Sequence, residues 1–171
     1  GQFDPTVHKA VWPSTGNFCR GGAFDSTLVG CTAVAILPEK MSRERFEWLE
    51  KMGAEVIATP GCESNVKEIY DKCWEIRQTR PDCVIFNQFE EFGNAIWHYH
   101  VTGEMLLDVF QSLPDGHRLA AFVSATGSAG TVAAGDRLRS HAPPIRVVVA
   151  EALQCPTLYQ FGFGAHRIEG I

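Results

Sequence analysis

The sequence contains no long hydrophobic run and no cluster of basic residues, and each absence excludes a class of protein. Apolar runs such as "VVVA" at 147–150 are far too short to span a bilayer. No positively charged segment followed by an apolar stretch opens the sequence, as a secretory signal would require. The net charge is −5, and basic residues are scattered, as in "RLR" at 137–139. We therefore expect a soluble, cytoplasmic protein with no nucleic-acid partner and no membrane partner.

The sequence also lacks closely spaced metal ligands. Its six cysteines include no pair with the spacing of a metal finger, and we expect free thiols in a reducing compartment. In "HYHVT" at 98–102, His98 and Thr102 share one helical face, but no cysteine or carboxylate completes a ligand set. No serine lies in a nucleophile-elbow pattern. We therefore assign no metal site and no Ser–His–Asp triad.

The chain does contain a regular alternation of strand-length apolar runs and segments of helical period. "TAVAIL" at 32–37 precedes "SRERFEWLEKMG" at 42–53, a helix with Ser42 as its expected N-cap and Gly53 as its end. Further strands are expected at 9–12, 54–59, 83–86, 118–123 and 145–151, and further helices at 19–30, 64–79, 94–112 and after Gly130. This alternation predicts an α/β fold with a mainly parallel sheet covered by helices on both faces. We expect two lobes, a smaller one over 12–92 and an incomplete larger one over 93–171.

Three loops that follow strands are candidates for ligand binding, because parallel sheets bind ligands outside the carboxyl ends of their strands. They are "PSTGNF" at 13–18, "FNQFEEFGN" at 86–94 and "SATGSAGT" at 124–131. The last has small residues, two hydroxyl donors and a helix behind it, which suits a compact phosphate. It matches neither the phosphate-binding NTPase template nor the dinucleotide fingerprint. Ordinary helix capping remains an alternative explanation for each loop.

Five motifs, in this order, resemble those of the pyridoxal-phosphate enzymes of the cysteine synthase type, also called the tryptophan synthase β type or fold type II. They are "STGN" at 14–17, "NQF" at 87–89, "HYHVTG" at 98–103, "GSAGT" at 127–131 and "HRIEGI" at 166–171. The resemblance implies that pyridoxal phosphate lies between the two lobes and that Asn17 hydrogen-bonds its ring hydroxyl. It implies that the loop after the 118–123 strand holds the phosphate, through Gly127, Ser128, Ala129, Gly130 and Thr131. It also implies that the α-carboxylate of the substrate is received by Ser14, Thr15, Gly16 and Gln88.

The sequence departs from the family pattern at several positions. The Schiff-base lysine of the family precedes the asparagine loop by more residues than this sequence contains, and Lys9 is too close to that loop to take its place. Phe18 stands where many relatives have a small residue. Ala129 stands in place of a frequent glycine, so a left-handed backbone there would be strained. We therefore expect a fragment that lacks the catalytic lysine and is inactive by itself.

The resemblance implies an enzyme of amino-acid metabolism, a transferase or lyase that catalyses β-replacement or β-elimination. Its substrate would be a small amino acid such as O-acetylserine, serine or cysteine, and the complete enzyme would be a homodimer. One alternative is α,β-elimination of the threonine or serine dehydratase type. Another is a non-catalytic module that binds a phosphate ligand or a protein partner through the same fold.

Overall fold

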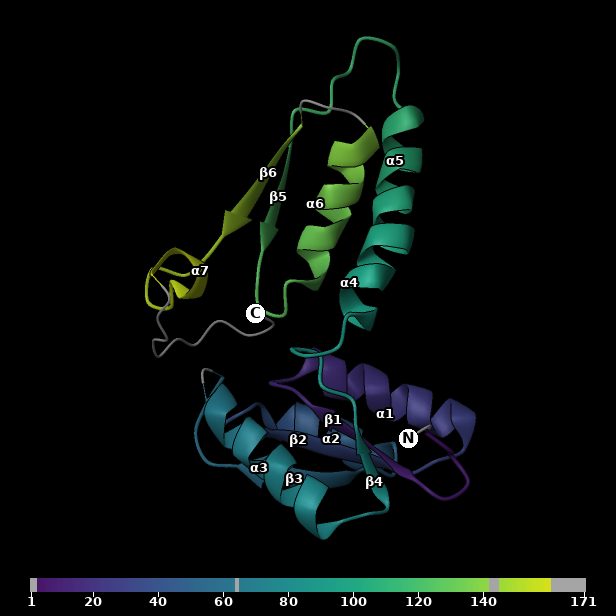
Figure 1. Ribbon diagram of the computed structural model, residues 1–171, viewed down its shortest axis with the longest axis vertical. Helices are drawn as coiled ribbons and strands as arrows, with labels where there is room; N and C mark the ends of the chain where they lie inside the picture. Colours follow the sequence, from purple (N-terminus) through teal and green to yellow (C-terminus); the bar gives the residue numbers. More distant parts are fainter. Residues whose placement is uncertain (1–2, 64, 142–144, 161–171) are drawn as a thin grey trace. The chain divides into compact units, whose positions relative to one another are not determined.

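The computed structural model describes residues 3–63, 65–141 and 145–160, and their contacts divide them into two compact units (Figure 1). The first unit extends to Gln88 and the second begins at Phe89. The sequence analysis placed the lobe boundary between 92 and 93. Both positions lie in the connection between the strand that ends at Ile85 and the helix that begins at Gly93.

The first unit contains a parallel sheet of four strands: β1 (Lys9–Pro13), β2 (Ala33–Pro38), β3 (Glu55–Thr59) and β4 (Cys83–Ile85). Their order across the sheet is β3-β2-β1-β4. Each strand is joined to the next by a helix: α1 (Asn17–Val29), α2 (Arg43–Lys51) and α3 (Val66–Thr79). The mainly parallel α/β arrangement predicted from the sequence is confirmed for this unit.

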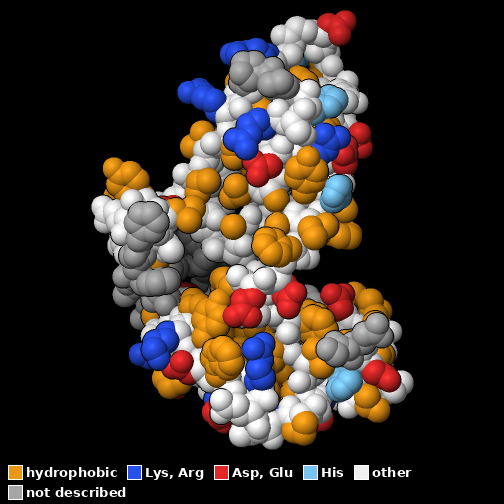
Figure 2. All heavy atoms as spheres, in the orientation of Figure 1, with side chains coloured by type: hydrophobic (Ala, Val, Ile, Leu, Met, Phe, Trp, Pro, Cys, Tyr) orange, Lys and Arg blue, Asp and Glu red, His pale blue; other side chains and the backbone are white. Residues whose placement is uncertain are grey.

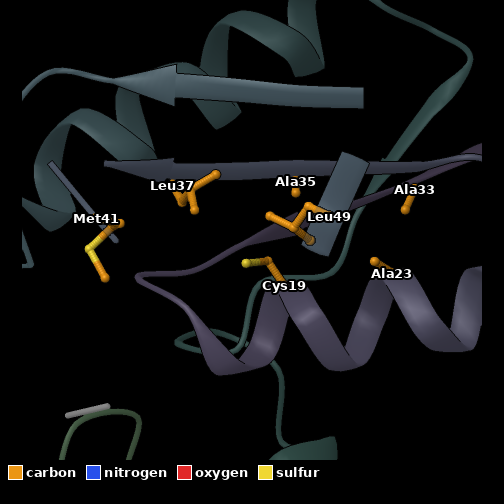
Figure 3. Packing of buried hydrophobic residues seen from close by; sticks show 7 residues of the cluster. All are labelled: Cys19, Ala23, Ala33, Ala35, Leu37, Met41 and Leu49. Carbon is orange, nitrogen blue, oxygen red and sulfur yellow. The ribbon is translucent and has the colours of Figure 1, made fainter. Parts of the chain in front are cut away.

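Alternate residues of β2 point to opposite faces of the sheet, which is why the strand reads as a continuous apolar run. Leu37 and its neighbours on one face pack against Cys19 of α1 and Leu49 of α2 (Figure 3). The other face packs against α3 through a cluster that contains Val34 and Ile69. Helices therefore cover both faces of this sheet, as the apolar pattern predicts.

The helix termini of the first unit lie within two residues of the predicted positions. Ser42 occupies the N-cap position of α2, as expected, although its side chain makes no capping hydrogen bond. The carboxyl ends of α1 and α2 are followed by Gly30 and Gly53, whose φ angles are 78° and 73°. These left-handed angles suit glycine because it has no Cβ.

The second unit begins with a nearly continuous helical segment composed of α4 (Gly93–Trp97), the π-helix η1 (His98–Thr102) and α5 (Gly103–Gln111). It continues with β5 (Ala121–Ala125), α6 (Gly130–His141), β6 (Arg146–Ala150) and the short α7 (Thr157–Gln160). β5 pairs with β6 in parallel from Ala121 to Ala125. The strand predicted at 118–123 is therefore displaced toward its carboxyl end, because the pairing with β6 sets its bounds.

Within the second unit, α6 lies between α5 and the β5–β6 pair (Figure 1). Its buried contacts form a small core that contains Leu107, Leu138 and Ile145. Val123 of β5 is 66% exposed, so part of this strand pair presents apolar side chains to solvent. None of the helices within the described ranges combines the length and the apolar character needed to cross a membrane.

Candidate functional site

The loop after β1 is held by its own hydrogen bonds. The backbone N–H of Ser14 donates to the carbonyl oxygen of Ile36 at 3.0 Å, which continues the β1–β2 pairing. The Ser14 hydroxyl oxygen accepts the N–H of Gly16, also at 3.0 Å. Ser14 and Gly16 are buried, whereas Asn17, the first residue of α1, is exposed. The buried part of the loop thus fixes its shape and leaves the Asn17 side chain open to a ligand.

The sheet order brings a second candidate residue to the same edge. β1 leads through α1 to β2 on one side, while β4 lies on its other side. The order in which strands are added to the sheet therefore reverses between β1 and β4. Such a reversal is the usual ligand-binding position of an open parallel sheet. Gln88, which is half-buried, lies in the connection after β4, and Ser14 comes directly after β1. The structure therefore places Ser14, Thr15, Gly16, Asn17 and Gln88 after two neighbouring parallel strands.

A residue that the sequence analysis did not select supports this loop. Arg45 of α2 donates from Nη1 to the carbonyl oxygen of Thr15 at 2.7 Å. An ideal Cβ built on Gly16 would lie 2.1 Å from the same nitrogen, so the guanidinium packs directly against the glycine. No local motif marks Arg45, because its partner lies 30 residues earlier in the chain.

Cys19 lies beneath the same loop, and its buried position keeps the thiol protonated. Its Sγ donates to the carbonyl oxygen of Gly16 at 3.0 Å, and its side chain is buried in the core. Burial raises the pKa of the Cys19 thiol to about 11, although the positive charge of Arg45 opposes the rise. The thiol is therefore neutral at physiological pH and acts as a small core residue.

Lys9 lies at the opposite end of β1 from the loop. Its ammonium is 3.4 Å from a carboxylate oxygen of Glu55 and 3.9 Å from one of Asp82. Arg80 donates to both oxygens of Glu55, at 2.6 Å and 2.9 Å. These charges join the start of β1 to the start of β3, and they hold Lys9 at the edge of the sheet away from the Ser14–Asn17 loop.

The loop from Gly127 to Thr131 belongs to the second unit, where it joins β5 to α6. Gly130 is the first residue of α6, so the free N–H groups of the first helical turn lie at this loop. Gly127, Ala129 and Thr131 are exposed and Ser128 is half-buried. Ala129 has φ 61°, so the backbone here is left-handed, a conformation that is unfavourable for alanine.

A second residue that the sequence analysis did not select holds this loop. The side-chain nitrogen of Asn94, in α4, donates to the Ser128 hydroxyl oxygen at 2.8 Å. An ideal Cβ on Gly130 would lie 2.3 Å from the Asn94 side-chain oxygen, so the amide covers the glycine. The sequence analysis placed Asn94 at the end of the 86–94 loop and at the start of an expected helix, but it could not predict the contact with Ser128, which spans 34 residues.

The residues of this loop fit a phosphate group. The buried Gly130 has no room for a side chain, and a helix of 12 residues starts there. Its N-terminal N–H groups and the Ser128 hydroxyl are donors of the kind that phosphate oxygens accept. The loop thus offers a phosphate group uncharged hydrogen-bond donors that the backbone holds in place.

The remaining expectations concern metals, charge and the last motif. The Nδ1 atom of His98 is 3.0 Å from the Thr102 hydroxyl, so these residues do share a face. Across the described ranges, no group of three or more His, Cys, Asp or Glu side chains has a metal-binding arrangement. On the face shown in Figure 2, Lys and Arg side chains are interspersed with acidic and apolar ones and form no continuous basic patch. The "HRIEGI" motif lies outside the described residues.

Comparison with known proteins connects these loops to a family. A family model described as "Pyridoxal-phosphate dependent enzyme" matches residues 7–169. A probable cysteine synthase of Bacillus subtilis is 31% identical over 94% of this chain and 51% of its own length. The cystathionine beta-synthase of Oryctolagus cuniculus is 28% identical over 94% of this chain and 30% of its own length. The chain thus spans about half the length, or less, of these curated relatives.

Solved structures agree with this result. A hydrogen sulfide-producing enzyme from Fusobacterium nucleatum is 27% identical, with a TM-score of 0.85 over 96% of this chain and 49% of that one. The O-acetylserine dependent cystathionine beta-synthase from Helicobacter pylori is also 27% identical, with a TM-score of 0.83 over 96% of this chain and 52% of that one.

Proposed function

Because this chain belongs to the pyridoxal-phosphate dependent enzyme family, we propose that it supplies cofactor-binding and substrate-binding parts of an enzyme for β-replacement or β-elimination. The substrate is a small amino acid with a leaving group on its β-carbon, such as O-acetylserine, serine or cysteine. The observation that carries the proposal is the Ser14–Asn17 loop, which lies with Gln88 at the reversal point of a parallel sheet.

The names of the relatives support this reaction class. The relatives include a cysteine synthase, a cystathionine beta-synthase and a hydrogen sulfide-producing enzyme, and these names agree with β-replacement or β-elimination on a small amino acid. Threonine or serine dehydration is the second candidate within the family. A non-catalytic module that binds phosphate or a protein is the candidate from another class. In the main proposal, the complete enzyme is a cytoplasmic homodimer that acts on small molecules.

Each set of residues has a defined task in this proposal. The N–H groups and hydroxyls from Gly127 to Thr131 hold the cofactor phosphate, and Asn17 hydrogen-bonds the ring hydroxyl. Ser14, Thr15, Gly16 and Gln88 receive the α-carboxylate of the amino acid. When bound, pyridoxal phosphate supplies an electron sink for bond breaking at the amino acid.

Calorimetric titration with pyridoxal phosphate, pyridoxal and inorganic phosphate tests the binding assignment. Pyridoxal phosphate and inorganic phosphate should compete for one site, while pyridoxal, which has no phosphate, should bind much more weakly. Gly130→Asp places a carboxylate in the loop and should abolish phosphate binding. Gly21→Asp adds the same charge to an exposed helix position with open space around it, and should leave binding unchanged. Unchanged affinity in a folded Gly130→Asp protein excludes this loop as the phosphate site.

Activity measurements on a longer version of the protein, one that includes the Schiff-base lysine absent from this sequence, separate the candidate reactions. Formation of cysteine from O-acetylserine and sulfide, or release of sulfide from cysteine, supports β-replacement or β-elimination. Formation of a 2-oxo acid from threonine supports the dehydratase alternative. Phosphate binding with no turnover of any of these amino acids supports the non-catalytic module.

A further inference from the structure

The side chains of Asn94 and Ser128 form a hydrogen bond in which Asn94 is the donor and Ser128 the acceptor. The Asn94 Nδ2 atom donates to Ser128 Oγ at 2.8 Å, and both residues belong to the second unit. An amide nitrogen has hydrogens but no acceptor capacity, so the serine oxygen must be the acceptor. The Ser128 hydroxyl hydrogen is therefore directed away from Asn94.

That hydrogen is available to a ligand. In the part of the chain that the structure describes, Asn94 is the hydrogen-bond partner of the Ser128 side chain. This bond involves the serine oxygen and not the hydroxyl hydrogen. Ser128 is half-buried, so its hydroxyl is within reach of solvent or of a bound group. A phosphate oxygen is an acceptor, and a hydroxyl fixed as a donor forms a charge-assisted hydrogen bond with it.

The same amide is fixed in position by the backbone beside it. It lies over Gly130, where an ideal Cβ would be 2.3 Å from Oδ1 and 2.4 Å from Nδ2. Any side chain at position 130 would push the amide away from Ser128. Ala129, between the two residues that Asn94 contacts, has φ 61°, so the loop keeps a strained conformation at this point.

We propose that Asn94 is a positioning residue of the phosphate loop, which acts by orienting the Ser128 hydroxyl as a donor. This inference rests on the proposed function, because it assumes that Gly127–Thr131 hold phosphate. Asn94 does not contact the ligand, and its effect on binding passes through Ser128. Loss of Asn94 therefore weakens phosphate binding only when Ser128 is present.

A double-mutant cycle tests this dependence. Affinities for inorganic phosphate and for pyridoxal phosphate are measured for the wild type, Asn94→Ala, Ser128→Ala and the double variant. Each single variant should bind about tenfold more weakly, and the double variant should be no weaker than Ser128→Ala, as expected for groups that act in series. Asn65→Ala is the matched control, since Asn65 makes its recorded contacts around Cys62, in the first unit. It should not change phosphate affinity.

Nuclear magnetic resonance of the nitrogen-labelled wild type provides a measurement that does not depend on folding of the Asn94 variant. Phosphate should shift the Asn94 side-chain amide signals and leave those of Asn65 in place. Equal losses from Asn94→Ala in the presence and absence of Ser128, or an Asn94 signal that does not move on phosphate binding, would overturn the inference. Failure of the wild type to bind either ligand would instead refute the proposed function from which the inference starts.

Discussion

Arg45 and Thr15 are joined by a hydrogen bond of 2.7 Å from the guanidinium to the backbone carbonyl, although they lie in α2 and in the loop after β1. The guanidinium also occupies the space that a side chain at Gly16 would need. A positive charge is thereby fixed directly behind the loop to which we assign the α-carboxylate of the substrate.

Replacement of Arg45 by methionine should loosen this loop. We expect the free energy of unfolding to fall by about 1.5–3 kcal/mol, the typical value of a hydrogen bond to a charged group. Arg43→Met is the control, because Arg43 lies on the same helix but is exposed and pairs with Glu47 of the same helix. Its cost should stay below about 1 kcal/mol. Urea unfolding measures both values, and equal costs would show that the Thr15 contact contributes nothing specific.

Neighbouring glycines in α1 should respond in opposite directions to alanine. An ideal Cβ at Gly22 would lie 2.0 Å from the Trp12 ring, so Gly22→Ala should destabilise the protein by at least 1–3 kcal/mol (an approximate range for overpacking). Gly21 has nothing within 4 Å of an added Cβ, so Gly21→Ala should stabilise it by about 0.5–1 kcal/mol through helix propensity. Thermal unfolding distinguishes them, and a loss of stability in both would contradict the packing described for α1.

Ala129→Gly should stabilise the second unit. Its φ of 61° is unfavourable for alanine by roughly 1–2 kcal/mol and accessible to glycine. We expect a net gain of about 0.5–1 kcal/mol, since glycine loses more entropy on folding. Ala133→Gly, the same substitution inside α6, should cost about 1 kcal/mol. Denaturant unfolding of the two variants should give changes of opposite sign, and a destabilised Ala129→Gly protein would count against the left-handed angle.

The Glu55 carboxylate predicts a pH dependence of stability. Its hydrogen bonds from Arg80 hold its pKa below the usual value, so its contribution is fully present above the pKa of the unfolded chain, about 4.3, and is lost as pH falls through the lower folded value. The side chain is 37% exposed, so Glu55→Gln should cost only about 1 kcal/mol at pH 7. The difference between wild type and variant, measured by urea unfolding, should shrink below about pH 4. A constant difference down to pH 3 would refute this assignment.

Lys9 is predicted not to form a specific covalent adduct with the cofactor. It is paired with Glu55 and Asp82 at the end of β1 opposite to the Ser14–Asn17 loop. After incubation of the chain with pyridoxal phosphate and reduction with borohydride, peptide mapping should show weak label distributed over exposed lysines. Stoichiometric label at Lys9 alone would mean that the lysine assignment based on sequence is incorrect.

The sequence by itself determined the alternation of strands and helices and the order of the loops. Apolar runs such as the one in β2 must be buried on both faces, so a parallel sheet with helices on each side follows from the pattern. The sequence also indicated, through the family resemblance, that a left-handed angle at Ala129 would be strained, but only the structure shows that the angle is left-handed. The bounds of β5 did not follow from the sequence, because they depend on which residues of β6 lie opposite.

The tertiary structure alone decided which side chains support the candidate site. Arg45 reaches Thr15 across 30 residues and Asn94 reaches Ser128 across 34, and neither pair has a local sequence pattern. The strand order decided that the connection with Gln88 follows a neighbour of β1, since pairing of β4 with β1 makes the two connections adjacent at the carboxyl edge of the sheet. Periodicity reports the environment of each segment, whereas contacts between distant segments depend on how the chain packs. That is the physical reason why the loops were predictable and the residues that position them were not.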